Sequence, residues 1–141
     1  MDRILAVDYG RRRIGLAVSD ELGLTAQGLP TVSVVSASAA AQAVAEVAAE
    51  WSAAEVVVGL PLNMDGSHGP MADAAEAFAD ALRDETGLPV SLWDERLTTQ
   101  SARRVLKDAA LKYRRQRGTT DRIAAGLLLE SYLQARASRQ E

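Results

Sequence analysis

The sequence predicts an α/β fold in which helices cover both faces of one mixed five-stranded sheet. Two short apolar runs near the start, 3–9 (RILAVDY) and 13–19 (RIGLAVS), have the pattern of a β-hairpin. Helix-like and strand-like segments then alternate along the chain. Residues 55–61 (EVVVGLP) form a valine-rich run that is typical of a buried strand with a parallel neighbour. The length of 141 residues predicts a single domain over 1–141.

The first part of the chain is expected to supply three strands and one helix. Gly10 to Arg12 form the turn of the predicted hairpin, and a third strand is expected over residues 29–35. The next stretch, residues 36–54, is rich in alanine and carries its larger apolar side chains at helical spacing. This stretch should be a helix with Ser36 as its N-cap.

The rest of the chain alternates between helix and strand. Residues 59–69 (GLPLNMDGSHG) are rich in turn-forming residues and should be a loop. The elements expected after it are a helix over 70–85, a strand over 90–93, a helix from Thr98 or Thr99 to about Ala110, a basic loop, and a last helix capped by Thr120. The resulting order, βββαβαβαα, is the layout of the ribonuclease-H-like fold.

The composition excludes several classes of protein. The chain has no cysteine, which excludes disulfides and thiolate metal sites. No apolar run approaches the length of a membrane span, and the N-terminus lacks the pattern of a secretory signal. We therefore expect a soluble, cytoplasmic protein with no membrane partner.

Charge is distributed unevenly along the chain. The net charge is -3, and the stretch from Asp20 to Asp94 holds 12 acidic residues against one base, Arg83. The stretch from Arg103 to Arg117 instead holds seven bases against one acid, a local charge of +6. Such asymmetry is typical of a face that binds a polyanion, although a solvated helix and loop would have the same composition.

Three carboxylates are expected to meet on one side of the sheet. Asp8 shares the face of Ile4 and Ala6 by strand alternation. Glu95 ends another apolar strand, and Asp121 begins the last helix on the side that packs inward. Acids gathered in this way repel one another unless a divalent cation or a shared proton holds them together. Ligand sets made only of oxygen favour Mg²⁺ or Mn²⁺ over zinc.

Each of these acids also has a local explanation. Asp8 could cap a turn, and Asp121 could be an acid favoured by the helix dipole. Asp94 and Glu95 could pair with Arg96. Because Asp94 and Glu95 alternate, only one of them can join a cluster if both lie in a regular strand.

Four segments carry a resemblance to a known family. They are "AVDYGRRRIGLAVSD", "VVVGLPLNMDGSHG", "WDERLTT" and "DRIAAGLLLESYL", and they follow one another over nearly the whole chain. Together they closely resemble the YqgF (RuvX) family of Holliday-junction-resolvase-like nucleases. The resemblance implies a ribonuclease-H-like fold, a bacterial cytoplasmic location and a role in maturing the 5′ end of small-subunit ribosomal RNA. It also implies that Asp8, Glu95 and Asp121 are the acidic triad of a nuclease.

Such a triad would hydrolyse phosphodiester bonds with the help of two metal ions. In the two-metal scheme, ions about 4 Å apart bind the attacking water and the leaving oxygen, and carboxylates fix the ions. Asp8 is our choice for the ligand shared by both ions, because a strand in mid-sheet is the most rigid platform in the chain. Glu95 and Asp121 would each complete the ligand set of one ion.

Basic residues are expected to hold the phosphates without reading the base sequence. The candidates lie in the predicted hairpin turn, beside Glu95 and in the basic stretch, and they are Arg11, Arg12, Arg13, Arg96, Arg103, Arg104, Lys107, Arg114 and Arg115. Arg13 could instead lie in the second strand and pair structurally. With one phenylalanine, three tyrosines and two tryptophans, the chain is short of stacking side chains, so a duplex or structured backbone is the expected ligand.

Several alternatives stay open at this point. The substrate could be structured RNA in pre-ribosomal particles or branched DNA, and symmetric cleavage of a junction would require a homodimer rather than a monomer. A non-catalytic binding or ribosome-assembly factor would gain nothing from acids beside a phosphate site. The actin-like ATPases and sugar kinases share an aspartate and glycine in the first hairpin but need two domains. His68, the only histidine, is expected to be a solvated loop residue.

Overall fold

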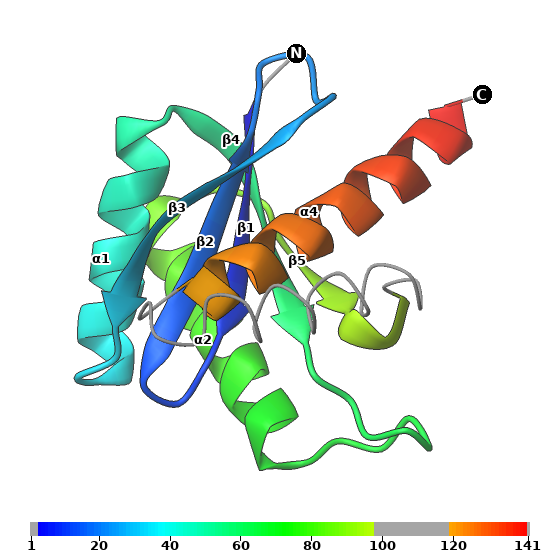
Figure 1. Cartoon of the computed structure of the whole chain (residues 1–141). Helices are drawn as coiled ribbons and strands as arrows, with labels where there is room; N and C mark the ends of the chain where they lie inside the picture. The colour runs from blue at the N-terminus through cyan, green and yellow to red at the C-terminus, as the bar shows by residue number, and fades with distance from the viewer. Residues whose placement is uncertain (1–2, 98–118, 141) are drawn as a thin grey trace.

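The computed structural model describes residues 3–97 and 119–140, with side chains described up to residue 97 and over residues 123–137. The described elements form one five-stranded sheet with helices on both faces (Figure 1). The strands are β1 (Arg3–Tyr9), β2 (Arg13–Ser19), β3 (Ala26–Ser33), β4 (Ala53–Leu60) and β5 (Val90–Asp94). The helices are α1 (Ala37–Glu50), α2 (Pro70–Thr86), the 3-10 turn η1 (Glu95–Leu97) and α4 (Thr119–Gln140).

The sheet is mixed, as the sequence predicts. Its strand order is β3-β2-β1-β4-β5. The first three strands form an antiparallel meander, while β4 runs parallel to both β1 and β5. The carboxyl ends of β1, β4 and β5 therefore meet at one edge of the sheet, the place where open α/β sheets generally bind their ligands.

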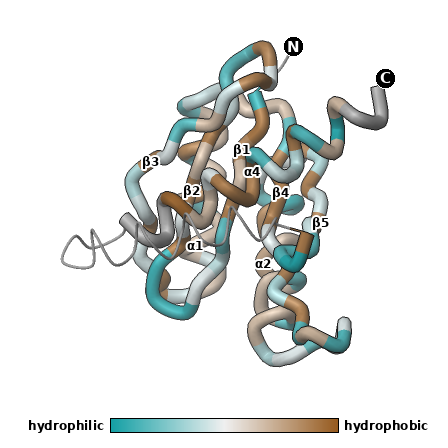
Figure 2. Tube along the Cα trace, turned by 45° about the vertical axis from the view of Figure 1, so that its right-hand side comes forward, coloured by the Kyte–Doolittle hydropathy of each residue, from teal (hydrophilic) through white to brown (hydrophobic). Residues whose placement is uncertain are grey.

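Two apolar layers hold the helices against the sheet. Helices α1 and α2 pack on the face that carries Leu5 and Val7 of β1. Helix α4 packs on the other face, against Ile4 and Ala6. Alternate residues of β1 therefore point into different layers, which explains why the strand is apolar on both sides. Figure 2 shows hydrophobic colouring along the central strands and hydrophilic colouring at the turn between β1 and β2.

The expected helix over 36–54 is shorter than predicted. Ser36 caps it as predicted, since its side chain accepts a hydrogen bond from the Ala39 backbone N–H at 3.2 Å. The helix ends before Trp51 because Ser52 adopts a positive φ of 53°, a conformation outside the right-handed helix. Ala53 then begins β4, two residues earlier than predicted.

Other boundaries differ by a few residues. Strand β3 begins at Ala26 rather than at residue 29, because residues 26–28 continue the ladder with the end of β2. Helix α4 already includes Thr119, so Thr120 lies inside the helix instead of capping it. The helix expected from Thr98 or Thr99 to Ala110, and the basic loop after it, lie outside the described residues. Among the described helices, none combines the length and hydropathy needed to cross a bilayer.

Candidate active site

Asp8 lies where β1 leaves the apolar core. It is the last residue but one of the strand and is half-buried. By strand alternation it belongs to the same face as Ile4 and Ala6, the face covered by α4. Its antiparallel partner is Gly15, which presents no side chain beside it. Asp8 therefore lies within β1, as the sequence predicts, at the point where the strand leaves the core.

Glu95 lies beside Asp8, although β1 and β5 are separated in the sheet by β4. It is the first residue of η1, directly after β5. Burial raises the pKa of Glu95, and the charge of Asp8, a hydrogen bond with Asp8 and the charge of Asp94 raise it further, to about 8. Glu95 therefore binds its proton more tightly than an ordinary glutamate does, and its carboxyl group is hydrogen-bonded to Asp8. The two carboxyl groups form a contact between segments 87 positions apart.

Gly59 makes room for Glu95 between these two strands. It lies in β4 opposite Trp93 of β5. A Cβ at position 59 would stand 2.4 Å from Oε1 of Glu95, a distance at which the carboxyl group would have to move. The sequence places Gly59 both in the valine-rich run over 55–61 and at the start of the loop over 59–69, and a glycine near the end of such a strand is a signal of close approach.

Asp121 lies in the first turn of α4, and its side chain is outside the described part of the chain. It precedes the buried Ala125 by four residues, so both positions share a helix face. Helix α4 crosses the sheet obliquely over β1, β2 and β3 (Figure 1), and its later residues Tyr132 and Arg136 reach Glu55 near the beginning of β4. The first turn of α4 is therefore directed toward the sheet edge where β4 ends (Figure 1).

Several polar contacts fix α4 in this position. The Tyr132 hydroxyl donates to Glu55 at 3.0 Å, and Arg136 pairs with the same carboxylate. The Trp93 indole N–H donates to the Ser131 hydroxyl at 3.2 Å, and the Trp93 ring meets the Tyr132 ring edge-on at 5.4 Å. The helix is thus attached to β4, the strand that contains Gly59, and to β5, the strand that precedes Glu95.

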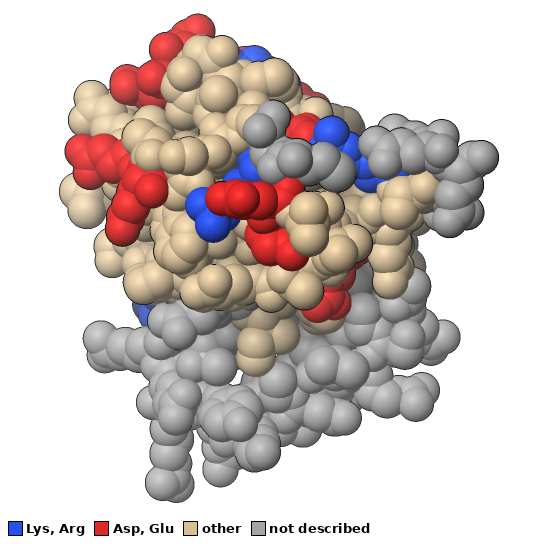
Figure 3. Space-filling model, turned by 90° about the horizontal axis from the view of Figure 1, so that it is seen from above, with Lys and Arg blue, Asp and Glu red and all other residues tan. Residues whose placement is uncertain are grey.

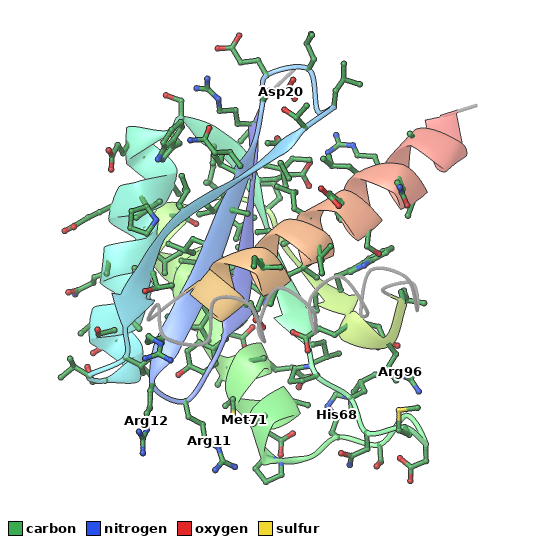
Figure 4. All side chains as sticks on the ribbon, in the orientation of Figure 1. Arg11, Arg12, Asp20, His68, Met71 and Arg96 are labelled. Atoms are coloured by element: carbon green, nitrogen blue, oxygen red, sulfur yellow. The ribbon has the colours of Figure 1, made fainter. Side chains whose placement is uncertain are left out.

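Arg96 connects the end of β5 to the loop between β4 and α2. Its guanidinium donates to both carboxylate oxygens of Asp94, with a shortest distance of 2.8 Å, and to the backbone oxygen of Met64 at 3.3 Å. Asp94 therefore lies in an ion pair with Arg96, the local explanation considered from the sequence. Figure 4 shows Arg96 extending toward this loop.

The three arginines of the hairpin turn lie at the same edge of the sheet as Asp8. Arg11 and Arg12 are exposed in the turn, and Arg13 is the first residue of β2. The Arg11 Nε donates to the sulfur of Met71 at 3.4 Å, which places the turn beside the start of α2 (Figure 4). Arg103, Arg104, Lys107, Arg114 and Arg115 lie outside the described residues.

The opposite end of the molecule has a different surface. Figure 3 views this end, where acidic and basic side chains are interspersed and acidic ones gather over α1. Arg3 lies there at 3.8 Å from Glu21 and stacks over the Trp51 ring at 5.7 Å. The two ends of the sheet therefore differ: the end with Asp8 and Glu95 carries the exposed arginines Arg11 and Arg12, whereas the opposite end carries charges of both signs (Figure 3).

Solved structures of junction resolvases share this fold. RuvC of Thermus thermophilus, solved in complex with a Holliday junction substrate, matches with a TM-score of 0.60 at 20% identity over 96% of each chain. The fowlpox virus resolvase, also solved with junction DNA, matches with a TM-score of 0.56 at 14% identity over 95% of this chain and 98% of the other. The sheet and helices therefore form a ribonuclease-H-like fold.

Relatives by sequence are much closer. A protein of Myxococcus xanthus with the name "Putative pre-16S rRNA nuclease" is 49% identical over 94% of this chain and 88% of its own length. A protein of Moorella thermoacetica with the same name is also 49% identical, over 93% of this chain and 94% of its own. The family model described as "RuvX: Holliday junction resolvase" matches residues 2–135. The chain belongs to the RuvX family and is a nuclease, a hydrolase that acts on phosphodiester bonds.

Proposed function

We propose that this protein is a divalent-metal-dependent nuclease that processes the 5′ end of the small-subunit ribosomal RNA precursor. The observation that carries the metal-dependent chemistry is the contact between Asp8 and Glu95 at the carboxyl edge of the sheet. The names of the relatives from Myxococcus xanthus and Moorella thermoacetica support the choice of substrate. Ribosomal RNA precursors are made in the bacterial cytoplasm, so we place the protein there, as a single domain.

The residues present fit a divalent cation. Asp8 and Glu95 offer oxygen donors only, which suits Mg²⁺ or Mn²⁺. The raised pKa of Glu95 reflects its burial first and the neighbouring charge of Asp8 second. A cation would neutralise this repulsion and release the proton. We propose that Asp8, Glu95 and Asp121 hold the metal, with Asp8 as the ligand shared by two ions.

The bound metal would supply positive charge for the phosphoryl oxygens and a more acidic water molecule as the nucleophile. The chain's own residues would position the carboxylates that hold the metal. The backbone of Asp8 is paired with Gly15 in the ladder between β1 and β2, which fixes the point from which its carboxylate extends. The place of Glu95 depends on the absence of a side chain at Gly59. These constraints are what a site needs to orient a phosphodiester for in-line attack.

Basic residues near this edge would bind the phosphates on either side of the scissile bond. Arg11 and Arg12 are exposed in the turn that follows β1 and are suited to this role. Arg13, Arg103, Arg104, Lys107, Arg114 and Arg115 are proposed as further contacts on the basis of sequence alone. Arg96 is a weaker candidate, because its guanidinium already binds Asp94 and Met64.

A second candidate function is the resolution of branched DNA. The family description and the fold shared with junction resolvases favour it. Symmetric cleavage of a four-way junction needs two active sites, and therefore a homodimer. A processing nuclease for RNA can act as a monomer, so oligomeric state and substrate preference test the two functions together.

The test compares both substrates with the same enzyme preparation. The full chain is incubated with a 5′-extended ribosomal RNA precursor, a four-way DNA junction and a linear DNA duplex, in Mg²⁺, Mn²⁺ or a chelator. We expect cleavage of the RNA at the mature 5′ end with either metal and none with the chelator. Cleavage of the junction alone would favour the second function, and cleavage of both substrates in chelator would refute the metal-dependent mechanism.

Variants connect this activity to the site. Asp8→Asn, Glu95→Gln and Asp121→Asn should each lower the cleavage rate by about 100-fold or more, because each removes a negative ligand without changing shape. Asp84→Asn, an exposed acid on α2, is the matched control and should cleave at the wild-type rate. Full activity of Asp8→Asn would remove Asp8 from the mechanism.

A further inference from the structure

A second group of ionisable side chains lies at the start of α2. His68 lies in the loop before the helix, next to its N-cap Gly69, and Asp73 and Glu76 project from the first two turns of α2. The His68 Nδ1 lies 3.3 Å from Oε1 of Glu76 and 3.9 Å from Oδ1 of Asp73. One ligand atom from each residue lies within 4.8 Å of the others. The only histidine of the chain therefore faces two carboxylates at close range.

These distances match the size of a small divalent cation. Two ligands that each lie about 2.0 to 2.1 Å from a tetrahedral ion are about 3.3 to 3.4 Å apart. The pair formed by His68 and Glu76 already has this separation. Asp73 needs only a small side-chain rotation, and it is exposed and free to make one. The three ligands would leave a fourth position open to water or to another oxygen.

The backbone that carries His68 is held in place by the loop before it. Asn63 donates its backbone N–H to the Ser67 carbonyl and its side-chain amide to the Ser67 hydroxyl, both at 3.0 Å. Ser67 also donates its backbone N–H to Asp65 at 2.9 Å. Asp73 and Glu76 are separated by three residues on a helix and so share one face. All three ligands therefore start from fixed backbone positions.

We propose that His68, Asp73 and Glu76 form a second metal site, selective for a divalent transition ion such as Zn²⁺. One imidazole nitrogen and two carboxylate oxygens favour Zn²⁺, Co²⁺ or Ni²⁺, whereas Mg²⁺ prefers oxygen alone. The site shares no residue with the Asp8–Glu95 pair, and it does not depend on the nuclease function proposed above. A bound ion would tie the loop over 61–69 to α2 and cancel two negative charges.

An ion bound at this site would change the charge near the β1–β2 turn. Met71, between His68 and Asp73 in the chain, accepts the hydrogen bond from Arg11 of the β1–β2 turn. The cluster therefore lies at the same end of the molecule as the exposed arginines (Figure 4). Two uncompensated carboxylates near this turn would repel phosphate, whereas a bound ion would remove the repulsion.

Zinc titration followed by calorimetry tests the proposal. The starting protein for the titration is the full chain with Asp8→Asn and Glu95→Gln, called the parent chain, in which the Asp8–Glu95 pair cannot contribute to Zn²⁺ binding. We expect one Zn²⁺ per chain. Adding His68→Ala or Glu76→Gln should weaken Zn²⁺ binding by about tenfold or more, since each removes a ligand. Adding Asp84→Asn, an exposed acid of the same helix, should leave the affinity unchanged.

Cobalt absorption provides a readout of the ligands themselves. Co²⁺ bound to few ligands absorbs visible light much more strongly than hydrated Co²⁺, and we expect this absorption in the parent chain but not in the His68→Ala chain. A protonated His68 in an ion pair with the two carboxylates would explain the same distances without any metal. Equal Zn²⁺ affinity for the parent and His68→Ala chains, or a cobalt spectrum like that of the hydrated ion, would overturn the proposal.

Discussion

At the scale of single residues, the contact between Asp8 and Glu95 is the most informative feature of the site. Burial and the charge of Asp8 give Glu95 a pKa of about 8, far above the value of 4.5 for an ordinary glutamate. A carboxyl group with a raised pKa in the folded state binds its proton more tightly there than in the unfolded chain. The metal-free protein is therefore stabilised by protonation of Glu95.

This shift predicts how stability depends on pH. The stabilisation is complete below about pH 4.5 and is lost as the pH rises toward about 8, because the folded state then also loses the proton. After allowance for partial exposure, the loss amounts to something on the order of 2 kcal/mol. Urea unfolding of the chelator-treated protein between pH 5 and 9 measures it. Glu95→Gln should remove this part of the slope, and an unchanged slope would refute the assignment.

Gly59 gives a second prediction at this scale. Gly59→Ala should push the Glu95 carboxyl away from Asp8 and lower the cleavage rate by about 100-fold. The atom displaced is the end of a side chain, so the fold should be retained. Gly126→Ala is the matched control, because a Cβ there meets no described atom within 4 Å. Because position 126 lies in the interior of α4, Gly126→Ala should raise the free energy of unfolding by about 0.5 to 1 kcal/mol and leave the cleavage rate unchanged.

At the scale of elements, the loop between β4 and α2 depends on a contact from η1. Arg96 joins Asp94 at the end of β5 to the backbone oxygen of Met64 in this loop. The guanidinium also lies 3.6 Å from the Cβ position of Gly66. The loop therefore keeps its place beside the carboxyl edge through an arginine that follows Glu95 directly in the sequence.

Loss of this contact should free the loop. In Arg96→Ala, we expect faster hydrogen exchange at the amides of Asn63, Gly66 and Ser67, which are hydrogen-bonded within the loop. The amides of β1 should keep their protection. Asp84→Asn serves as the control, and hydrogen–deuterium exchange followed by mass spectrometry measures both segments. Unchanged exchange over 61–69 would mean that the loop holds its conformation without Arg96.

Most element types could be predicted from the sequence, whereas several boundaries could not. The hairpin strands were predicted at their observed bounds because the glycine and arginine turn separates two clear apolar runs. The end of α1 was missed because alanine favours helix over the whole stretch, and the positive φ of Ser52 has no sequence signal. The start of β3 was missed because its pairing with β2 sets that boundary.

The sequence predicted the individual acids of the candidate site but not the contacts between them. Strand alternation indicates the face of Asp8, and the abrupt end of an apolar run indicates Glu95. The contact between them depends on the order β1-β4-β5, which no local pattern contains. The pairing of Arg96 with Asp94 is local and was considered from the sequence, whereas the contacts of Arg96 with Met64 and of His68 with Glu76 depend on how the loop between β4 and α2 folds. His68 was expected to be solvated, and it is exposed yet close to both carboxylates.

At the scale of the whole molecule, charge and topology support each other. The exposed arginines of the β1–β2 turn lie at the edge where β1, β4 and β5 end. The other end of the sheet carries interspersed charges, with acidic groups over α1 (Figure 3). A nucleic acid attracted to the first end would meet Asp8 and Glu95 there.

This arrangement predicts how binding depends on salt. Arg11→Ala combined with Arg12→Ala should weaken binding of a structured RNA and lower the slope of log K against log salt by about 1 to 2, because fewer counterions are released. Arg3→Ala removes the same kind of charge at the other end of the sheet and should leave the slope unchanged. Fluorescence anisotropy at several salt concentrations measures the slope. Equal slopes for both variants would contradict the location of the phosphate contacts.

The measurement that tests the central claim most directly is the anomalous scattering of Mn²⁺ in crystals of the full chain. We predict an anomalous peak within bonding distance of the carboxylates of Asp8 and Glu95, with Asp121 contributing a further oxygen, and loss of the peak in Asp8→Asn. Crystals in saturating Mn²⁺ in which the carboxyl groups of Glu95 and Asp8 still contact each other, and no anomalous peak lies beside either group, would contradict the account.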